Sequence, residues 1–177
     1  PYQAAFAQHI EHEPGPLQVS PGDTALHVAA RNGHVGVIRH LLAASTPVDI
    51  PKRGGATALY IAAQQGRTEA VHALLDKGAC ADIATDKGAT PLLVAADFGQ
   101  AEVVLALLQR AAQVDQQTLG GDTALTVASR RGSARIARTL LEQKAGVDLA
   151  TTTGGGASPL AIAAYFGHTE VARTLLE

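Results

Sequence analysis

The feature that most constrains this chain is a short motif that returns at a fixed interval of 33 residues. The motif reads glycine, any residue, Thr or Ser, Ala or Pro, then Leu, and its five copies begin at Gly22, Gly55, Gly88, Gly121 and Gly156. The last interval is 35 residues, and its two extra residues fall in the run Gly154-Gly155-Gly156. A fixed period of this size predicts a solenoid, in which each unit buries its apolar face only against its neighbours.

Each motif predicts the start of a short helix. In the third copy, Thr90 is a good N-cap because its hydroxyl can accept a hydrogen bond from an unpaired amide of the first turn. Pro91 follows at the first helical position, where its missing N–H costs little. Gly99 would end the helix in the left-handed conformation. The same place in the other copies is held by Gly33, Gly66, Gly132 and Gly167. A helix of about two turns is unstable alone in water, so neighbouring units must pack against it.

A second helix is predicted in every unit, because pairs of apolar residues recur there one helical turn apart. In the third unit the pairs are Val103-Val104 and Leu107-Leu108, which place one apolar stripe on the helix. The five predicted second helices are 34–43, 67–76, 100–109, 133–142 and 168–177.

A connector follows each second helix, and four connectors hold an aspartate at the same step, namely Asp49, Asp82, Asp115 and Asp148. Aspartate favours turns because its carboxylate accepts hydrogen bonds from nearby backbone amides. Each connector is therefore predicted to be an extended hairpin.

Composition narrows the functional classes. Apolar residues are 46% of the chain and charged residues 17%, which is typical of a folded protein. The formal net charge of −2 gives no general attraction to nucleic acid or to an anionic membrane. Cys80 is the single cysteine, so no internal disulfide is possible and an intracellular, cytoplasmic setting is expected. No apolar run approaches the ~18 residues of a membrane span.

Two helices joined by a tight glycine turn and followed by a hairpin, on a 33-residue step, resemble the ankyrin repeat. The closest matches are Thr90-Pro91-Leu92 with Ala95-Ala96, and Leu26-His27 with Ala29-Ala30. The resemblance implies an all-α solenoid of about five stacked repeats, each a helix-turn-helix with a β-hairpin loop. In that family the histidine after Leu forms hydrogen bonds between repeats. Only His27 keeps it, so we expect fewer polar contacts between repeats than in an idealised array.

The resemblance also gives the expected division of the chain. Residues 1–21 are expected to be an N-terminal capping helix or degenerate repeat with a linker. The repeat domain is expected over 22–177, with units 22–54, 55–87, 88–120, 121–155 and 156–177.

The family binds other proteins, so the resemblance implies a protein-binding module with no catalytic residues, cofactor or metal. The expected contact surface is the concave face, which includes the pair of residues before each helix-ending glycine. These pairs differ in every copy although the framework does not. They are Arg31 and Asn32, Gln64 and Gln65, Asp97 and Phe98, Arg130 and Arg131, and Tyr165 and Phe166.

Two features of these pairs leave alternatives open. Three of the six aromatic residues of the chain, Phe98, Tyr165 and Phe166, occupy the pairs, where they either contact a partner or pack on adjacent hairpins. The fourth unit has a formal charge of +2, and its arginines are either a solvated surface or a docking patch for an acidic peptide or phosphate. The patch would consist of Arg130, Arg131, Arg135 and Arg138.

Other chemistry is not supported. No histidines are spaced as a zinc site requires, and Gly154-Gly155-Gly156 lacks the Lys-Ser/Thr of a phosphate loop. The expected partner is another protein or peptide, not nucleic acid or a membrane, and the chain is expected to be monomeric in isolation. As an alternative, the chain is the targeting or regulatory arm of a larger enzyme or effector, whose catalytic domain lies outside these residues.

Overall fold

The computed structural model describes residues 22–152 and 155–177, and ten helices form within them as five consecutive pairs. The first helices are α1 (Ala25–Asn32), α3 (Ala58–Gln64), α5 (Pro91–Asp97), α7 (Ala124–Arg131) and α9 (Pro159–Tyr165). The second helices are α2 (Val35–Ala43), α4 (Thr68–Asp76), α6 (Ala101–Gln109), α8 (Ala134–Glu142) and α10 (Thr169–Leu176). The capping helix predicted within 1–21 lies outside the described residues.

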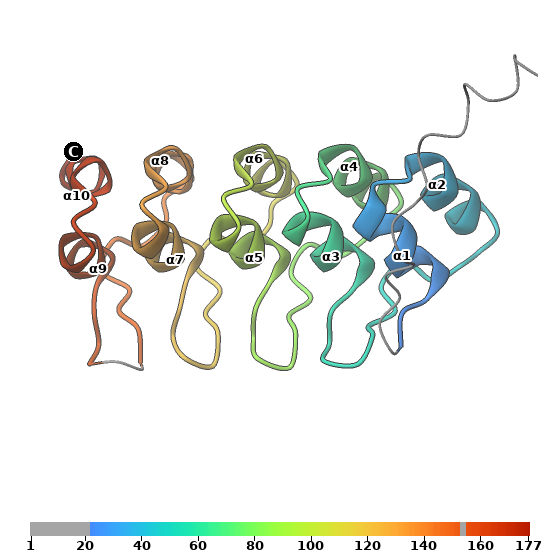
Figure 1. Cartoon of the computed structure of the whole chain (residues 1–177), viewed down its shortest axis with the longest axis horizontal. Helices are drawn as coiled ribbons and strands as arrows, with labels where there is room; N and C mark the ends of the chain where they lie inside the picture. The colour runs from blue at the N-terminus through green and yellow to red at the C-terminus, as the bar shows by residue number, and fades with distance from the viewer. Residues whose placement is uncertain (1–21, 153–154) are drawn as a thin grey trace, which may run out of the picture.

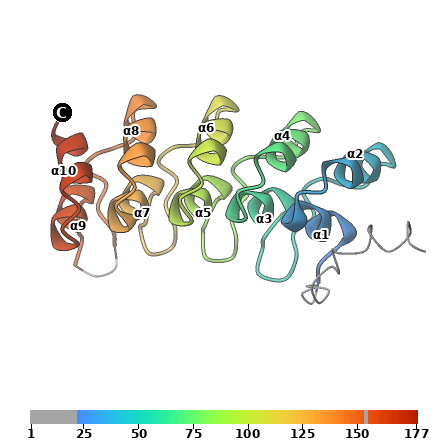
Figure 2. The ribbon, with the colours of Figure 1, turned by 45° about the horizontal axis from the view of Figure 1, so that its top comes forward.

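The pairs stand side by side as a solenoid. Figure 1 shows the first helices in one row and the second helices in another, with the connecting loops projecting from the far side of the first row. Each first helix contacts the first helix of the next pair, and each second helix contacts the next second helix. Figure 2 shows the same order from a second direction. The predicted all-helical repeat fold is confirmed.

The first helices begin where the sequence predicts. Thr24, Thr57, Thr90, Thr123 and Ser158 are the N-caps, and each side-chain oxygen accepts a hydrogen bond from the backbone N–H three residues later. Pro91 and Pro159 lie in the first turn, as predicted. Two caps are reciprocal. The backbone N–H of Thr24 donates to His27 Nδ1 at 3.0 Å, and the backbone N–H of Thr123 donates to Thr126 Oγ1 at 2.9 Å.

The glycine after each first helix turns the chain into the second helix. Gly33 has φ +74°, and the other four predicted glycines have φ between +66° and +73°. At Gly33 the following amide, that of His34, donates to the carbonyl of Ala29 at 2.9 Å. The second helices then begin one residue later than predicted, because the first residue of each predicted span is the N-cap and not a helical residue.

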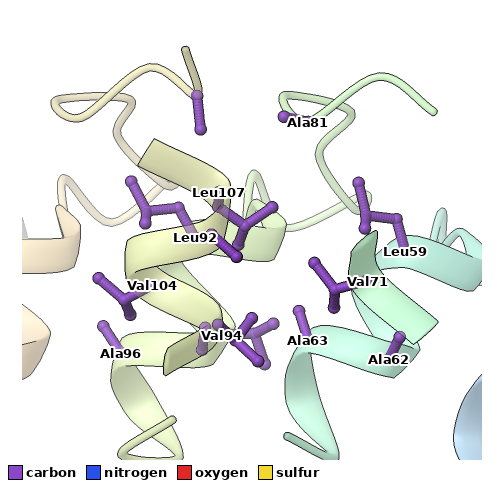
Figure 3. Packing of buried hydrophobic residues seen from close by; sticks show 14 of the residues in the cluster. Leu59, Ala62, Ala63, Val71, Ala81, Leu92, Val94, Ala96, Val104 and Leu107 are labelled. Carbon is purple, nitrogen blue, oxygen red and sulfur yellow. The ribbon is translucent and has the colours of Figure 1, made fainter. Parts of the chain in front are cut away.

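The core is a series of thin layers between pairs. Leu59, Leu92 and Leu125, one from each of three successive motifs, are at most 1% exposed. Figure 3 shows such layers, with Leu59 and Val71 from one pair and Leu92, Val104 and Leu107 from the next. Each fully buried Leu or Val contributes about 1.5–3 kcal/mol. Short helices that could not persist alone are therefore held by their neighbours on both sides.

The connectors turn back on themselves as predicted, but the described residues contain no β-strand. Within one connector, the amide of Thr85 donates to the carbonyl of Ala89 at 3.0 Å. Between neighbouring connectors, the amide of Asp86 donates to the carbonyl of Gly54 at 3.1 Å, and this contact recurs further along the chain. Isolated bonds of this kind form a hairpin-shaped loop without a continuous ladder.

The repeated aspartates contact the next repeat and not their own turn. The carboxylates of Asp49, Asp82 and Asp115 accept from the backbone amides of Cys80, Gln113 and Gly146, each 31 residues later. The prediction of a local turn contact for these aspartates was therefore wrong. The aspartate column thus supplies one set of polar contacts between repeats, whereas the ring of His27 caps its own helix.

None of the helices in the described part combines the length and the apolar character that crossing a bilayer requires.

Candidate protein-binding surface

The ten residues predicted as partner contacts lie at the ends of the five first helices, just before the turn glycines. The second residue of each pair is exposed in every repeat. These residues are Asn32, Gln65, Phe98, Arg131 and Phe166. The first residue is half-buried in four repeats, at Arg31, Gln64, Asp97 and Arg130, and exposed only as Tyr165. The second residues therefore form an exposed column whose chemistry changes from repeat to repeat.

The backbone beneath this column is bonded to the following repeat. The carbonyls of Arg31, Gln64 and Arg130 accept hydrogen bonds from the side chains of the next second-helix N-caps. The donors and distances are Arg67 Nε at 3.1 Å, Gln100 Nε2 at 3.4 Å and His168 Nε2 at 3.0 Å. Because a carbonyl only accepts, the His168 ring carries its proton on Nε2 in this contact. The ends of α1, α3 and α7 are thus fixed in place before any partner binds.

Three of the four arginines of the fourth repeat are paired with acids. Arg130 pairs with Asp122 and Arg131 Nε donates to Asp97 at 2.9 Å. Arg135 Nη1 lies 2.8 Å from Glu102. The hydrogen bond to Asp97 raises the pKa of Arg131 above its usual value, so its charge is permanent. These arginines are fixed by acids of the same surface, and they do not form a patch of free cations.

Arg138 differs from them, since it is exposed and forms no ion pair among the residues that the structure describes. Like Arg135, it lies on α8, in the row of second helices, whereas Arg130 and Arg131 lie on α7. The predicted four-arginine patch is thus divided between the two rows of the solenoid.

The aromatic side chains of the predicted pairs are not buried under hairpins. Phe98 is 53% exposed, Tyr165 84% and Phe166 50%. The rings of Tyr165 and Phe166 meet edge to face, with centroids 5.0 Å apart and an interplanar angle of 85°. Phe166 also stacks on the ring of His168, at a centroid distance of 6.1 Å. Edge-to-face packing is a favoured arrangement of aromatic pairs, and it orders these rings while leaving most of Tyr165 in water.

A hollow of about 400 Å³ lies beside this aromatic pair. Its lining includes Arg130, Ala157, Ala161, Ile162, Tyr165 and Phe166. The lining is mostly apolar, and Arg130 contributes the one charge among these six side chains. The sequence pattern predicts the exposed aromatic residues but not this hollow, because Arg130 comes from α7 in the preceding repeat and its distance from α9 is set by the fold.

Besides Arg131, two side chains of the first helices have shifted pKa values. Burial lowers the pKa of His27 below its usual value of 6.5, and the nearby Asp23 carboxylate offsets part of the effect. Burial also raises the pKa of Tyr60, and Asp97 adds to the rise. Both side chains are therefore neutral near pH 7, and neither adds charge to the column.

The sequence did not predict the inter-repeat contacts of Arg67, Gln100 and His168. These three residues nevertheless hold the same position in their repeats, at the 33-residue step or, before the last repeat, the 35-residue step. Their side chains differ in type, so the column looks variable in the sequence. The constant element is their partner, a backbone carbonyl that every residue carries.

A family model described as ankyrin repeats in three copies matches residues 4–85, 26–118 and 92–177, which together span nearly the whole chain. The search among curated proteins found no match to this chain.

Proposed function

This chain belongs to the ankyrin repeat family, and from that premise we propose that it binds a partner protein through the exposed ends of its first helices. Ankyrin repeats are generally protein–protein interaction modules. The observation that carries the proposal is the exposed column Asn32, Gln65, Phe98, Arg131 and Phe166, which changes in every repeat while the surrounding framework is constant.

Two physical arguments support this face. Exposed aromatic side chains such as Phe98 and Tyr165 carry large apolar areas, which a partner can bury favourably. At three of the five helix ends the backbone carbonyl beside the column, that of Arg31, Gln64 or Arg130, is already held by the next repeat, so binding there orders few new groups and loses little conformational entropy. Exposed aromatic side chains on an ordered backbone therefore favour binding of a protein partner.

The test compares two multiple variants of the whole chain as bait for partner capture. The first replaces by alanine four residues of the proposed face, Phe98, Arg131, Tyr165 and Phe166. The control replaces a column of exposed residues on the second helices, at the same step of 33, namely Arg39, His72, Leu105 and Arg138. Circular dichroism checks that both variants keep the helical signal of the unaltered chain.

We expect the first variant to lose the captured protein and the control to retain it. The reverse result, with retention by the first variant and loss by the control, would place the interface on the second helices and overturn the proposal.

A further inference from the structure

We propose that the hollow beside α9 takes an apolar side chain of a partner peptide, and that Arg130 binds a carboxylate on the preceding residue of that peptide. This inference rests on the proposed function, because the hollow lies at the C-terminal end of the same face. It adds the chemistry of the partner at that end, an acidic residue followed by a large apolar one.

The hollow has the shape and lining for an apolar side chain. Its volume of about 400 Å³ lies toward the lower end of the range of ligand pockets, which is roughly 300–1,000 Å³. Ala157, Ala161 and Ile162 form apolar parts of its lining, with Tyr165 and Phe166 beside them. One Phe or Leu side chain with its own backbone suits this space.

The aromatic pair makes the end of α9 different from the ends of the other first helices. The position of Tyr165 is held by Arg31, Gln64, Asp97 and Arg130 in the preceding copies, and all four are half-buried. Tyr165 is 84% exposed, and its edge-to-face contact with Phe166 fixes the direction of the ring. A partner side chain in the hollow would cover a ring that is already ordered.

Arg130 supplies the charge complementarity that selects an acidic neighbour. Its contact with Asp122 joins one guanidinium nitrogen, Nη2, to one carboxylate oxygen, and its side chain remains 37% exposed. A guanidinium has five N–H donors, so donors remain for a second carboxylate. The backbone of Arg130 is held by His168 Nε2 at 3.0 Å, which limits movement of this residue away from the hollow.

The charge around the hollow favours the same partner. Arg130 is the one charged side chain in the lining of the hollow. A lysine or arginine on the peptide would face the Arg130 guanidinium and be repelled, whereas an aspartate or glutamate would be attracted.

The test uses three synthetic nonapeptides that differ only at two central positions in a Gly/Ser background: Asp-Phe, Asn-Phe and Asp-Ala. Each is titrated into the ¹⁵N-labelled whole chain, and backbone amide shifts are followed by NMR, which detects binding in the millimolar range. We expect Asp-Phe to shift the amides of Ala161, Ile162 and Phe166 in a saturable way. Asn-Phe should bind roughly three- to ten-fold more weakly because the charge-assisted bond is lost, and Asp-Ala should give no saturable shift.

Variants identify the residue that reads the carboxylate. Arg130→Gln should make Asp-Phe and Asn-Phe bind equally. Arg138→Gln removes the same charge from the same repeat but outside the hollow, and it should leave the preference for Asp-Phe unchanged. Asp122→Asn, which releases Arg130 from its acid, should strengthen binding of Asp-Phe more than that of Asn-Phe.

Equal binding of Asp-Phe and Asn-Phe to the unaltered chain would overturn the proposal. A loss of preference in Arg138→Gln as large as in Arg130→Gln would also overturn it, because the effect would then be one of general charge. If Asp-Phe leaves the α9 amides unshifted while the four-residue variant of the face still loses its partner, the proposed face is right and the chemistry assigned to the hollow is wrong.

Discussion

The carboxylate of Asp82 accepts a hydrogen bond of 2.8 Å from the backbone amide of Gln113, which lies 31 residues later in the next repeat. Asp115 and the amide of Gly146 form the same contact at 2.9 Å. A solenoid has no central core, so its cohesion depends on contacts of this kind between neighbours. The aspartate column therefore stabilises the stacking of repeats and not the turn in which it lies.

Removing one of these contacts should destabilise the fold. We expect Asp115→Ala to lower the free energy of unfolding by about 1–2 kcal/mol, because the half-buried amide of Gly146 loses a charged acceptor. Asp148 holds the same place in the last connector, is exposed, and makes no such bond among the described residues. Asp148→Ala is thus the matched control and should change the stability by less than about 0.5 kcal/mol. Urea unfolding followed by circular dichroism measures both, and equal losses would contradict an inter-repeat role.

A second prediction concerns the second residue after each second helix, which adopts positive φ in every connector between described pairs. Ala111 has φ +59° there, and Gly78 has φ +83° at the same place in the preceding repeat. The left-handed conformation is strained for a residue with a Cβ. Ala111→Gly should raise the free energy of unfolding by about 0.5–1 kcal/mol.

Gly78→Ala provides the reciprocal measurement. A Cβ added to Gly78 would meet nothing within 4 Å, so only backbone strain changes. We expect a loss similar in size to the gain from Ala111→Gly. If both substitutions were neutral in urea unfolding, strain at this column would not limit stability.

How much of this could be read from the sequence depends on where the partner of each residue lies. The N-caps at Thr24 and Thr90 were predicted correctly because cap and amide are three residues apart and the geometry is local. The contact of Asp82 with Gln113 was not predicted, because its donor is a backbone amide 31 residues away, and every residue except proline carries such an amide. The exposure of Tyr165 was likewise left open. Its position in the repeat predicts which end of the helix it occupies, but not how much of its side chain the neighbouring residues cover.

A third prediction follows from the buried His27. Burial lowers the pKa of its ring below 6.5 in the folded chain, so the unfolded chain takes up the proton more readily. The contribution of neutral His27 to stability is therefore complete well above pH 6.5, the pKa in the unfolded chain. It is lost as the pH falls below that value and through the lower pKa of the folded chain. His27→Thr copies the reciprocal cap of Thr123 and Thr126, which does not titrate.

We expect the unaltered chain to lose more stability than His27→Thr between pH 7 and pH 5, as measured by urea unfolding at both pH values. The other histidines are common to both proteins, so the difference isolates His27. A larger acid loss in His27→Thr would mean that the folded chain prefers the charged ring.

The last prediction separates backbone strain from contact between repeats at the turn glycines. Gly99 and Gly132 have nearly the same φ, +73° and +72°, so alanine should impose the same strain at both. A Cβ on Gly99 would meet nothing within 4 Å, whereas one on Gly132 would lie 2.7 Å from Nδ1 of His168. That ring donates to the Arg130 carbonyl at 3.0 Å and stacks on Phe166, so it cannot move without losing both contacts.

Gly99→Ala should therefore cost about 1 kcal/mol, and Gly132→Ala about 1–2 kcal/mol more. A double variant, Gly132→Ala with His168→Ala, removes the clash and leaves the strain. The extra cost of the glycine substitution, measured relative to His168→Ala alone, should then fall to the value at Gly99. If Gly132→Ala cost the same with and without the His168 ring, the close approach of this ring to the turn would have no energetic consequence.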